Sequence, residues 1–173
     1  MDIRTLGSGS IGATNVWRAA GARYAIPVMV LDIGKGFVPA LIATMVAGHV
    51  AGALAGGAAM FGHWRPILLR FAKGGKTVAT CGGALLGLAP VVGLIGIVVW
   101  LVVFALTRYA SVSSILAPLS LPVAALLLSE PWPVLVFTSA AALGVFLLHR
   151  PNLARLRAGT ETRVQLRRKP ARA

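Results

Sequence analysis

The chain of 173 residues is 57% hydrophobic and only 12% charged, and its mean hydropathy is +0.83. A soluble fold of this length cannot bury so much apolar surface, which excludes an ordinary soluble domain and indicates an integral membrane protein. The net charge of +13 is typical of nucleic-acid binders, but the basic residues here separate apolar runs and gather near the C-terminus, so the expected partner is the lipid bilayer and not nucleic acid.

The first element is a polar, glycine-rich segment with the sequence GSGSIGATNVWR, which runs from Gly7 to Arg18. It matches the dinucleotide-binding fingerprint in spacing, but that motif requires a preceding strand and a βαβ unit, and only six residues precede it here. The residue types still favour an anion-binding loop. Glycines let backbone N–H groups converge on an anion, and an arginine can bind phosphate through two hydrogen bonds. The alternative is a flexible loop with an incidental arginine. The hydroxyl donors of this segment are Ser8, Ser10 and Thr14.

Two apolar runs follow, Ile26 to Ala47 and His49 to Phe61, and each is a candidate transmembrane helix. The first run contains Asp32 and Lys35, which lie on one helical face. Charges inside a membrane are costly and usually pair or line a functional cavity. The sequence favours a structural ion pair, with Lys35 reaching toward the basic loops as the other possibility.

The next polar segment contains Lys73, Gly74, Gly75, Lys76 and Thr77. It imitates the end of a P-loop, but the earlier glycine that the motif requires would be residue 70, which is an arginine. Two lysines around a Gly-Gly turn at the start of a helix still make a plausible anion site. Ordinary basic flanking of a membrane span is the alternative.

Four further apolar runs complete the chain, at Val78 to Ala89, Val91 to Thr107, Ser113 to Leu128 and Trp132 to Leu148. The predicted fold class is therefore all-α, a polytopic transmembrane helix bundle with six spans. A span needs about 20 apolar residues, so we expect the short second and third runs to tilt, to use flanking residues or to be partly re-entrant.

Two polar segments flank the last spans. The segment RYASVSS carries Ser111, Ser113 and Ser114, which are also common helix-capping residues. His149 and Asn152 follow the final span, and a histidine there is either an acid, base or phosphate donor, or structural. The basic tail after Arg163 is expected to bind anionic lipid.

Charge orients this topology. If the six spans alternate, 16 of the 17 Lys and Arg residues lie on one side of the bilayer, and the remaining one, Lys35, lies inside the first span. Basic residues are retained on the cytoplasmic side. We therefore expect a multi-pass membrane protein whose motif loops and C-terminus are cytoplasmic.

In their order along the chain, the motifs GSGSIGATNVWR, DIGKG, GHW, KGGKTVAT, RYASVSS and HRPNLARLRAGTETR resemble the bacterial PlsY-type acyl-phosphate:glycerol-3-phosphate acyltransferases. The resemblance extends from Asp2 to Arg163, and it implies that the protein lies in the bacterial inner membrane. It implies a membrane enzyme of phospholipid synthesis that moves a fatty acyl group from acyl phosphate to glycerol 3-phosphate, gives lysophosphatidic acid and phosphate, and needs no cofactor and no metal. The family has seven helices, one of them before the Asp2 segment, so this chain would hold six. Either its start was assigned downstream of the true one, or the protein lacks that helix.

The resemblance also implies site residues. Residues 1–148 would form the membrane-embedded acyltransferase domain, and residues 149–173 the end of the catalytic motif and the basic tail. Ser10 departs from the asparagine that is usual in the family. The implied catalytic residues are Ser8, Arg18, Lys76, His149 and Asn152, and the implied substrate-binding residues are Gly7, Gly9, Ser10, Thr14, Asn15, Lys73, Gly74, Gly75, Ser111, Ser113, Ser114 and Glu161.

Two other functions stay open at this point. A small transporter for an anionic metabolite would explain the spans and the charges in the first run, although it would not explain why the polar motifs gather on one face. An inactive, truncated relative is the second. The residues alone also leave acyl-CoA and acyl carrier protein open as donors.

Overall fold

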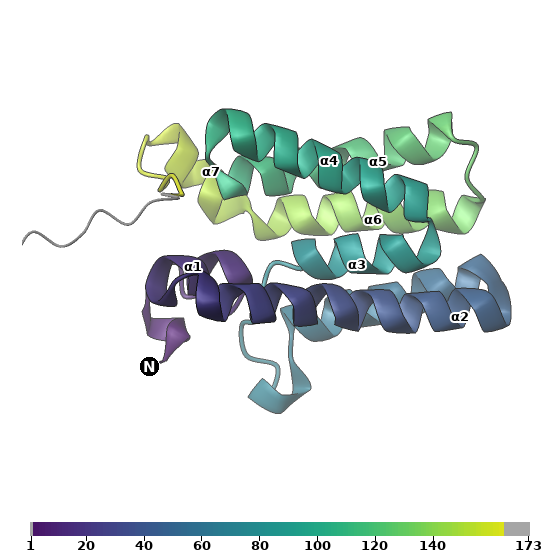
Figure 1. The fold of residues 1–173 in the computed structure, drawn as a ribbon, viewed down its shortest axis with the longest axis horizontal. Helices are drawn as coiled ribbons and strands as arrows, with labels where there is room; N and C mark the ends of the chain where they lie inside the picture. Colours follow the sequence, from purple (N-terminus) through teal and green to yellow (C-terminus); the bar gives the residue numbers. More distant parts are fainter. Residues whose placement is uncertain (1, 165–173) are drawn as a thin grey trace, which may run out of the picture.

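The computed structural model describes residues 2–164, and all regular elements among them are helical, which confirms the predicted all-α class (Figure 1). Within the described residues, seven α-helices and two short turns of 3₁₀ helix build the bundle. The elements are η1 (Ile3–Thr5), α1 (Ala13–Ala20), α2 (Ala22–Trp64), η2 (Ile67–Leu69), α3 (Val78–Leu88), α4 (Pro90–Thr107), α5 (Ala110–Leu127), α6 (Trp132–Leu148) and α7 (Arg150–Arg157).

Helix α2 is a hairpin of two helices and not one rod. Gly48 breaks it with a φ of 79°, a left-handed conformation that favours glycine. After the break the chain returns along itself, because Lys35 in the first arm contacts His63 in the second. The two arms correspond to the first two predicted spans, which are confirmed as helices.

The remaining predicted spans are also confirmed as helices, with boundaries that differ by at most three residues. By length and apolarity α2, α4 and α5 can cross a membrane, and α6 forms with α7 a pair bent by 53°. Helix α3 has only 11 residues, fewer than a crossing needs, as expected for the short third run. Pro90 opens α4 at a first-turn position where its missing N–H costs nothing.

Two short helices, α1 and α7, were not predicted from the sequence, which indicated polar loops there. Each has only eight residues. Gly21, with a φ of 87°, separates α1 from α2. Both short helices lie at the same end of the bundle (Figure 1).

Small residues bring α2 and α3 into close contact. A side chain at Gly36 would meet the backbone of Thr80, and one at Gly83 would meet the backbone of Ile33. In lipid the hydrophobic effect does not drive helices together, so the van der Waals packing that such close backbone approach allows is a main source of helix association. Helix α3 thus lies at the centre of the bundle, where its residues Cys81, Ala84, Leu85 and Leu88 belong to the buried core.

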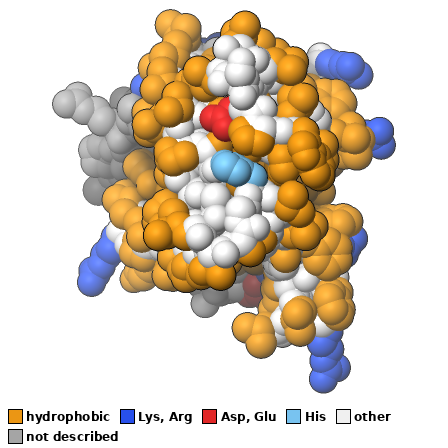
Figure 2. All heavy atoms as spheres, turned by 90° about the vertical axis from the view of Figure 1, so that its right-hand side faces the viewer, with side chains coloured by type: hydrophobic (Ala, Val, Ile, Leu, Met, Phe, Trp, Pro, Cys, Tyr) orange, Lys and Arg blue, Asp and Glu red, His pale blue; other side chains and the backbone are white. Residues whose placement is uncertain are grey.

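The two ends of the bundle differ in charge. Figure 2 shows the end opposite α1 and α7, where apolar side chains surround a central histidine and acidic side chain, and Lys and Arg project at the periphery. This picture agrees with the predicted charge asymmetry. The predicted lipid-binding tail, and with it the end of the second predicted domain, lies outside the described residues.

Candidate active site

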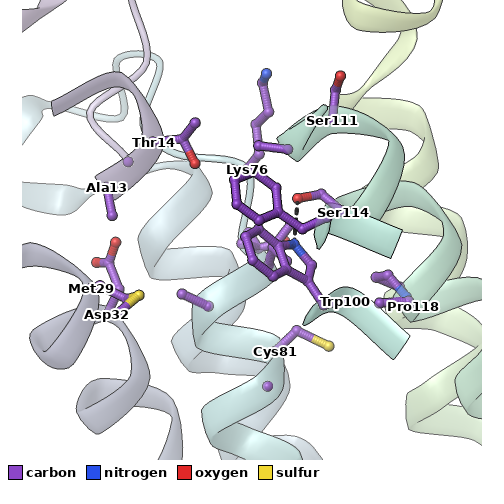
Figure 3. Close-up of a pocket in the computed structure, with 18 of the residues that line it drawn as sticks. Ala13, Thr14, Met29, Asp32, Lys76, Cys81, Trp100, Ser111, Ser114 and Pro118 are labelled. Atoms are coloured by element: carbon purple, nitrogen blue, oxygen red, sulfur yellow. Dashed lines mark hydrogen bonds between the residues drawn. The ribbon is translucent and has the colours of Figure 1, made fainter. Parts of the chain in front are cut away.

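A cavity of about 560 Å³ lies between the α1–α2 segment and helices α3, α4 and α5. Figure 3 shows that Lys76 and Ser111 extend toward one end of it, whereas Trp100, Cys81 and Pro118 lie farther along. The cavity therefore joins a polar, cationic end to an apolar groove. The predicted site residues that line it are Ser8, Ser10, Thr14, Asn15, Arg18, Lys76, Ser111, Ser114, His149, Asn152 and Glu161.

Asn15 holds the first motif in shape. Its side-chain oxygen accepts a hydrogen bond from the Ser8 N–H at 3.0 Å, and its amide donates to the carbonyl oxygens of Ser10 at 2.9 Å and Leu6 at 3.0 Å. Gly7 packs on this amide in a left-handed conformation, with a φ of 57°. Asn15 is buried and its hydrogen-bonding groups are used within the loop, so it fixes where the Ser8 side chain stands.

Arg18 reaches from α1 to the segment after α7. Its Nη2 donates to the Thr162 carbonyl oxygen at 2.8 Å. Its Nε atom is buried and has no hydrogen-bond partner within residues 2–164. Burial, together with the nearby Arg155, lowers the pKa of the guanidinium. A half-buried cation with a buried, unbonded Nε donor beside a cavity is suited to an anionic ligand.

Lys76 begins a chain of polar contacts that ends on Arg155. The Lys76 amine donates to Asn152 Oδ1 at 2.6 Å, and Asn152 Nδ2 donates to Glu161 Oε1 at 2.8 Å. Arg155 Nε in turn donates to Glu161 Oε2 at 2.7 Å. Burial first, and then the charge of Arg155, lower the pKa of Lys76 to about 8. The network fixes the direction of this amine, whereas burial is the main cause of its lowered pKa.

His149 lies at the bend between α6 and α7, where it ends one helix and begins the other. Its Nδ1 is 2.8 Å from the Val145 carbonyl oxygen. A carbonyl can only accept, so Nδ1 carries the proton and Nε2 is left as an acceptor. Burial, reinforced by the Lys76 charge, lowers the pKa of His149 to about 4. At neutral pH the ring is uncharged and can accept a hydrogen bond or a proton.

The third motif divides between the cavity and the packing of the bundle. Ser114 lines the cavity, and its hydroxyl accepts a hydrogen bond from Trp100 Nε1 at 3.1 Å (Figure 3). Ser113 is fully buried, donates to the Tyr109 carbonyl oxygen at 3.1 Å, and does not line the cavity. The other predicted site residues that lie outside the lining are Gly7, Gly9, Lys73, Gly74 and Gly75.

Two residues that were not among the sequence candidates do line the cavity, Asp32 and His63. The predicted ion pair between Asp32 and Lys35 is confirmed, with 2.5 Å between the carboxylate and the amine. His63 joins the pair across the α2 hairpin, 28 residues from Lys35. The motif GHW contained the only signal for His63. In the part of the chain described, no group of three or more His, Cys, Asp or Glu side chains could hold a metal ion.

Fold and cavity together define an integral membrane protein with a cationic chamber that opens into an apolar groove. A sequence model described as "Glycerol-3-phosphate acyltransferase" matches residues 1–159. A curated relative with this name from Rhodospirillum rubrum is 44% identical, over 98% of this chain and 82% of the relative. Another, from Allorhizobium ampelinum, is 42% identical, over 94% of this chain and 79% of the relative. The chain belongs to the glycerol-3-phosphate acyltransferase family, as the motifs predicted.

Solved structures agree with the family. The crystal structure of PlsY, an integral membrane glycerol 3-phosphate acyltransferase, in its glycerol 3-phosphate form is 39% identical, with a TM-score of 0.91, and the match covers 95% of this chain and 83% of that one. Its lysophosphatidic acid form matches with a TM-score of 0.86 over 92% and 82% of the two chains. The chain is thus a membrane acyltransferase, and the transporter alternative is not supported.

Proposed function

We propose that this enzyme transfers a fatty acyl group from acyl phosphate to the 1-hydroxyl of glycerol 3-phosphate and releases lysophosphatidic acid and inorganic phosphate. The observation that carries the proposal is a cavity in which a cationic end meets an apolar groove. Both substrates carry phosphate, and the donor also carries a long apolar chain. The volume of about 560 Å³ lies within the range of roughly 300–1,000 Å³ that is usual for small-molecule sites.

The proposed reaction is a direct transfer. The 1-hydroxyl oxygen of glycerol 3-phosphate attacks the acyl carbonyl carbon and forms the new ester bond. The bond between that carbon and the phosphate oxygen then breaks, and its electron pair leaves with the phosphate. The hydroxyl proton passes to one of two acceptors, the free Nε2 of His149 or an oxygen of the substrate phosphate. Because phosphate is a good leaving group, the reaction demands neither a metal nor a covalent acyl-enzyme.

The proposed work of the protein is to position two anions and to stabilise developing charge. Arg18 and Lys76 bring cations to the polar end of the cavity, where both can bind phosphate. Asn152 aims the Lys76 amine and is itself held by Glu161. Ser8, which stands on the loop that Asn15 fixes, contributes a hydroxyl donor. The remaining lining residues of the first and third motifs complete the substrate contacts.

The proposed location is the bacterial inner membrane, with the polar end of the cavity at the cytoplasmic face. The support is the concentration of Lys and Arg in the connections on one side of the spans. Glycerol 3-phosphate is water-soluble and would enter from that side. The acyl chain of the donor would lie at bilayer depth, along Trp100, Leu85 and Leu121.

The donor is tested with isolated membranes that contain the protein and receive labelled glycerol 3-phosphate. We expect lysophosphatidic acid with palmitoyl phosphate and none with palmitoyl-CoA or palmitoyl-acyl carrier protein. Equal product from palmitoyl-CoA would contradict the proposed donor. Arg18→Ala should abolish the product, whereas Arg23→Ala, which removes an exposed arginine from the start of α2, is the matched control and should not.

A further inference from the structure

Three charged or titratable side chains meet inside the α2 hairpin, beside the cavity. Lys35 Nζ lies 2.5 Å from Asp32 Oδ1 and 2.5 Å from His63 Nδ1, and His63 Nδ1 lies 3.4 Å from the same carboxylate oxygen. Asp32 and His63 are buried, and both line the cavity. The reaction proposed above uses none of the three. Charges within a membrane span are costly and are usually kept for a function.

The hydrogen-bond roles inside this cluster follow from its chemistry. A lysine ammonium has three donors and no acceptor, so it donates to Asp32 and to His63 Nδ1. His63 Nδ1 is then the acceptor, which leaves Nε2 as the nitrogen that carries a proton. Lys35 therefore sets the tautomer of His63, and the two hydrogen bonds of its ammonium restrain the orientation of the ring.

The ring of His63 lies directly against the loop that carries Lys76. A side chain at Gly75 would overlap the imidazole atoms, and one at Gly74 would overlap the His63 carbonyl oxygen. The backbone completes the attachment, because the Gly75 N–H donates to the His63 carbonyl at 3.0 Å and the Gly74 N–H donates to the Trp64 carbonyl at 2.9 Å. The two glycines thus let the loop rest on the end of α2, with the imidazole as its support.

The next residue along this loop is Lys76, whose amine contacts Asn152. A shift of the loop on its support would move that amine relative to α7, and misplacement of a catalytic group by about 1 Å can cost roughly a hundredfold in rate. Gly75 has no left-handed φ that would itself require glycine. Glycine is required there by the presence of the His63 ring.

We propose that Asp32, Lys35 and His63 form a positioning unit that acts through the Gly74–Gly75 backbone to place the Lys76 amine for the phosphate group of the substrates. The inference rests on the proposed function, since it assigns Lys76 to phosphate. The three residues are positioning residues and make no contact with the reacting atoms. Ion pairing alone would not explain the cluster, because a pair that only neutralised buried charge would need neither the imidazole nor the two glycines.

The first test separates positioning from charge neutralisation. Asp32→Asn, Lys35→Met and the double variant are purified in detergent, and the kcat and KM for glycerol 3-phosphate are measured. The double variant leaves no charge in the span, so a purely structural pair predicts recovery of wild-type kinetics. We expect instead that the double variant keeps at least a tenfold loss in kcat/KM, mostly as a raised KM. Ser139→Ala, which removes an exposed hydroxyl bonded only within α6, is the control and should be unchanged.

A second test does not depend on the recovery of those variants. Gly75→Ala and His63→Ala are compared with the double variant Gly75→Ala/His63→Ala. If the ring is the support, the added methyl group costs at least tenfold in kcat/KM when His63 is present and less than threefold when residue 63 is alanine. Equal losses in both backgrounds, or wild-type kinetics in the Asp32 and Lys35 double variant, would overturn the inference. A wild-type protein that forms no lysophosphatidic acid would instead refute the proposed function.

Discussion

Replacement of Lys76 by methionine removes one charge from the cavity while it keeps most of the side-chain volume. The Lys76 side chain is half-buried, lines the polar end of the cavity and donates from its amine to Asn152 Oδ1 at 2.6 Å. A unit charge about 4 Å from a phosphate oxygen contributes about 4 kcal/mol at an effective dielectric constant of 20. Since 1.36 kcal/mol corresponds to a tenfold change in rate, Lys76→Met should lower kcat/KM by roughly a thousandfold.

The assay is the initial rate of lysophosphatidic acid formation from palmitoyl phosphate and labelled glycerol 3-phosphate, with protein purified in detergent. Arg70→Met is the matched control, because it removes an exposed basic residue from the same loop that does not line the cavity. Arg70→Met should keep the wild-type rate. A loss of less than tenfold in Lys76→Met, with the protein folded, would refute the assignment of this amine to a substrate phosphate.

Three further outcomes follow from the geometry. Because the pKa of Lys76 is lowered to about 8, its amine is charged below that pH and neutral above it. The value of kcat/KM should therefore fall as the pH rises through about 8. In Lys76→Arg this decrease at alkaline pH should be absent from the pH profile. Asn152→Ala removes the side chain that links Lys76 to Glu161 and should lower kcat/KM at least tenfold in the same assay. An unchanged rate would contradict the role of this network. Gly36→Ala should lower the free energy of unfolding in detergent by roughly 1–3 kcal/mol through overpacking, because its methyl group meets the Thr80 backbone. In Gly34→Ala, on the same helix, the methyl group meets nothing within 4 Å, so this variant should be neutral or stabilising.

The spans could be predicted from the sequence because lipid-facing helices are marked by composition alone. Each of the six apolar runs became a helix or a helical arm, and Pro90 and Gly48 break the chain where breaks were expected. Helices α1 and α7 escaped prediction since each has only eight residues and a mixed composition, too short for a period of 3.6 residues to stand out. Both owe their place to tertiary contacts such as the bond from Arg18 to Thr162.

The site could be predicted as a set of motifs on one face, but not as a geometry. Residue type does not tell whether a polar side chain faces the substrate or the scaffold. The side-chain amide of Asn15 donates its hydrogen bonds within its own loop, and the Ser113 hydroxyl donates to the Tyr109 carbonyl oxygen. The contact of His63 with Lys35 depends on the α2 hairpin, which joins residues that are 28 positions apart. Such directions depend on how the helices pack, and no local pattern in the sequence encodes them.

The central claim is that one cavity brings acyl phosphate and glycerol 3-phosphate together for direct transfer. The most direct measurement uses purified protein with palmitoyl phosphate and labelled glycerol 3-phosphate, and follows lysophosphatidic acid and inorganic phosphate in the same reaction. The account predicts that the two products appear in equal amounts and that both disappear in Arg18→Ala. Phosphate release that continues without glycerol 3-phosphate, or product formation that persists in Arg18→Ala, would contradict it.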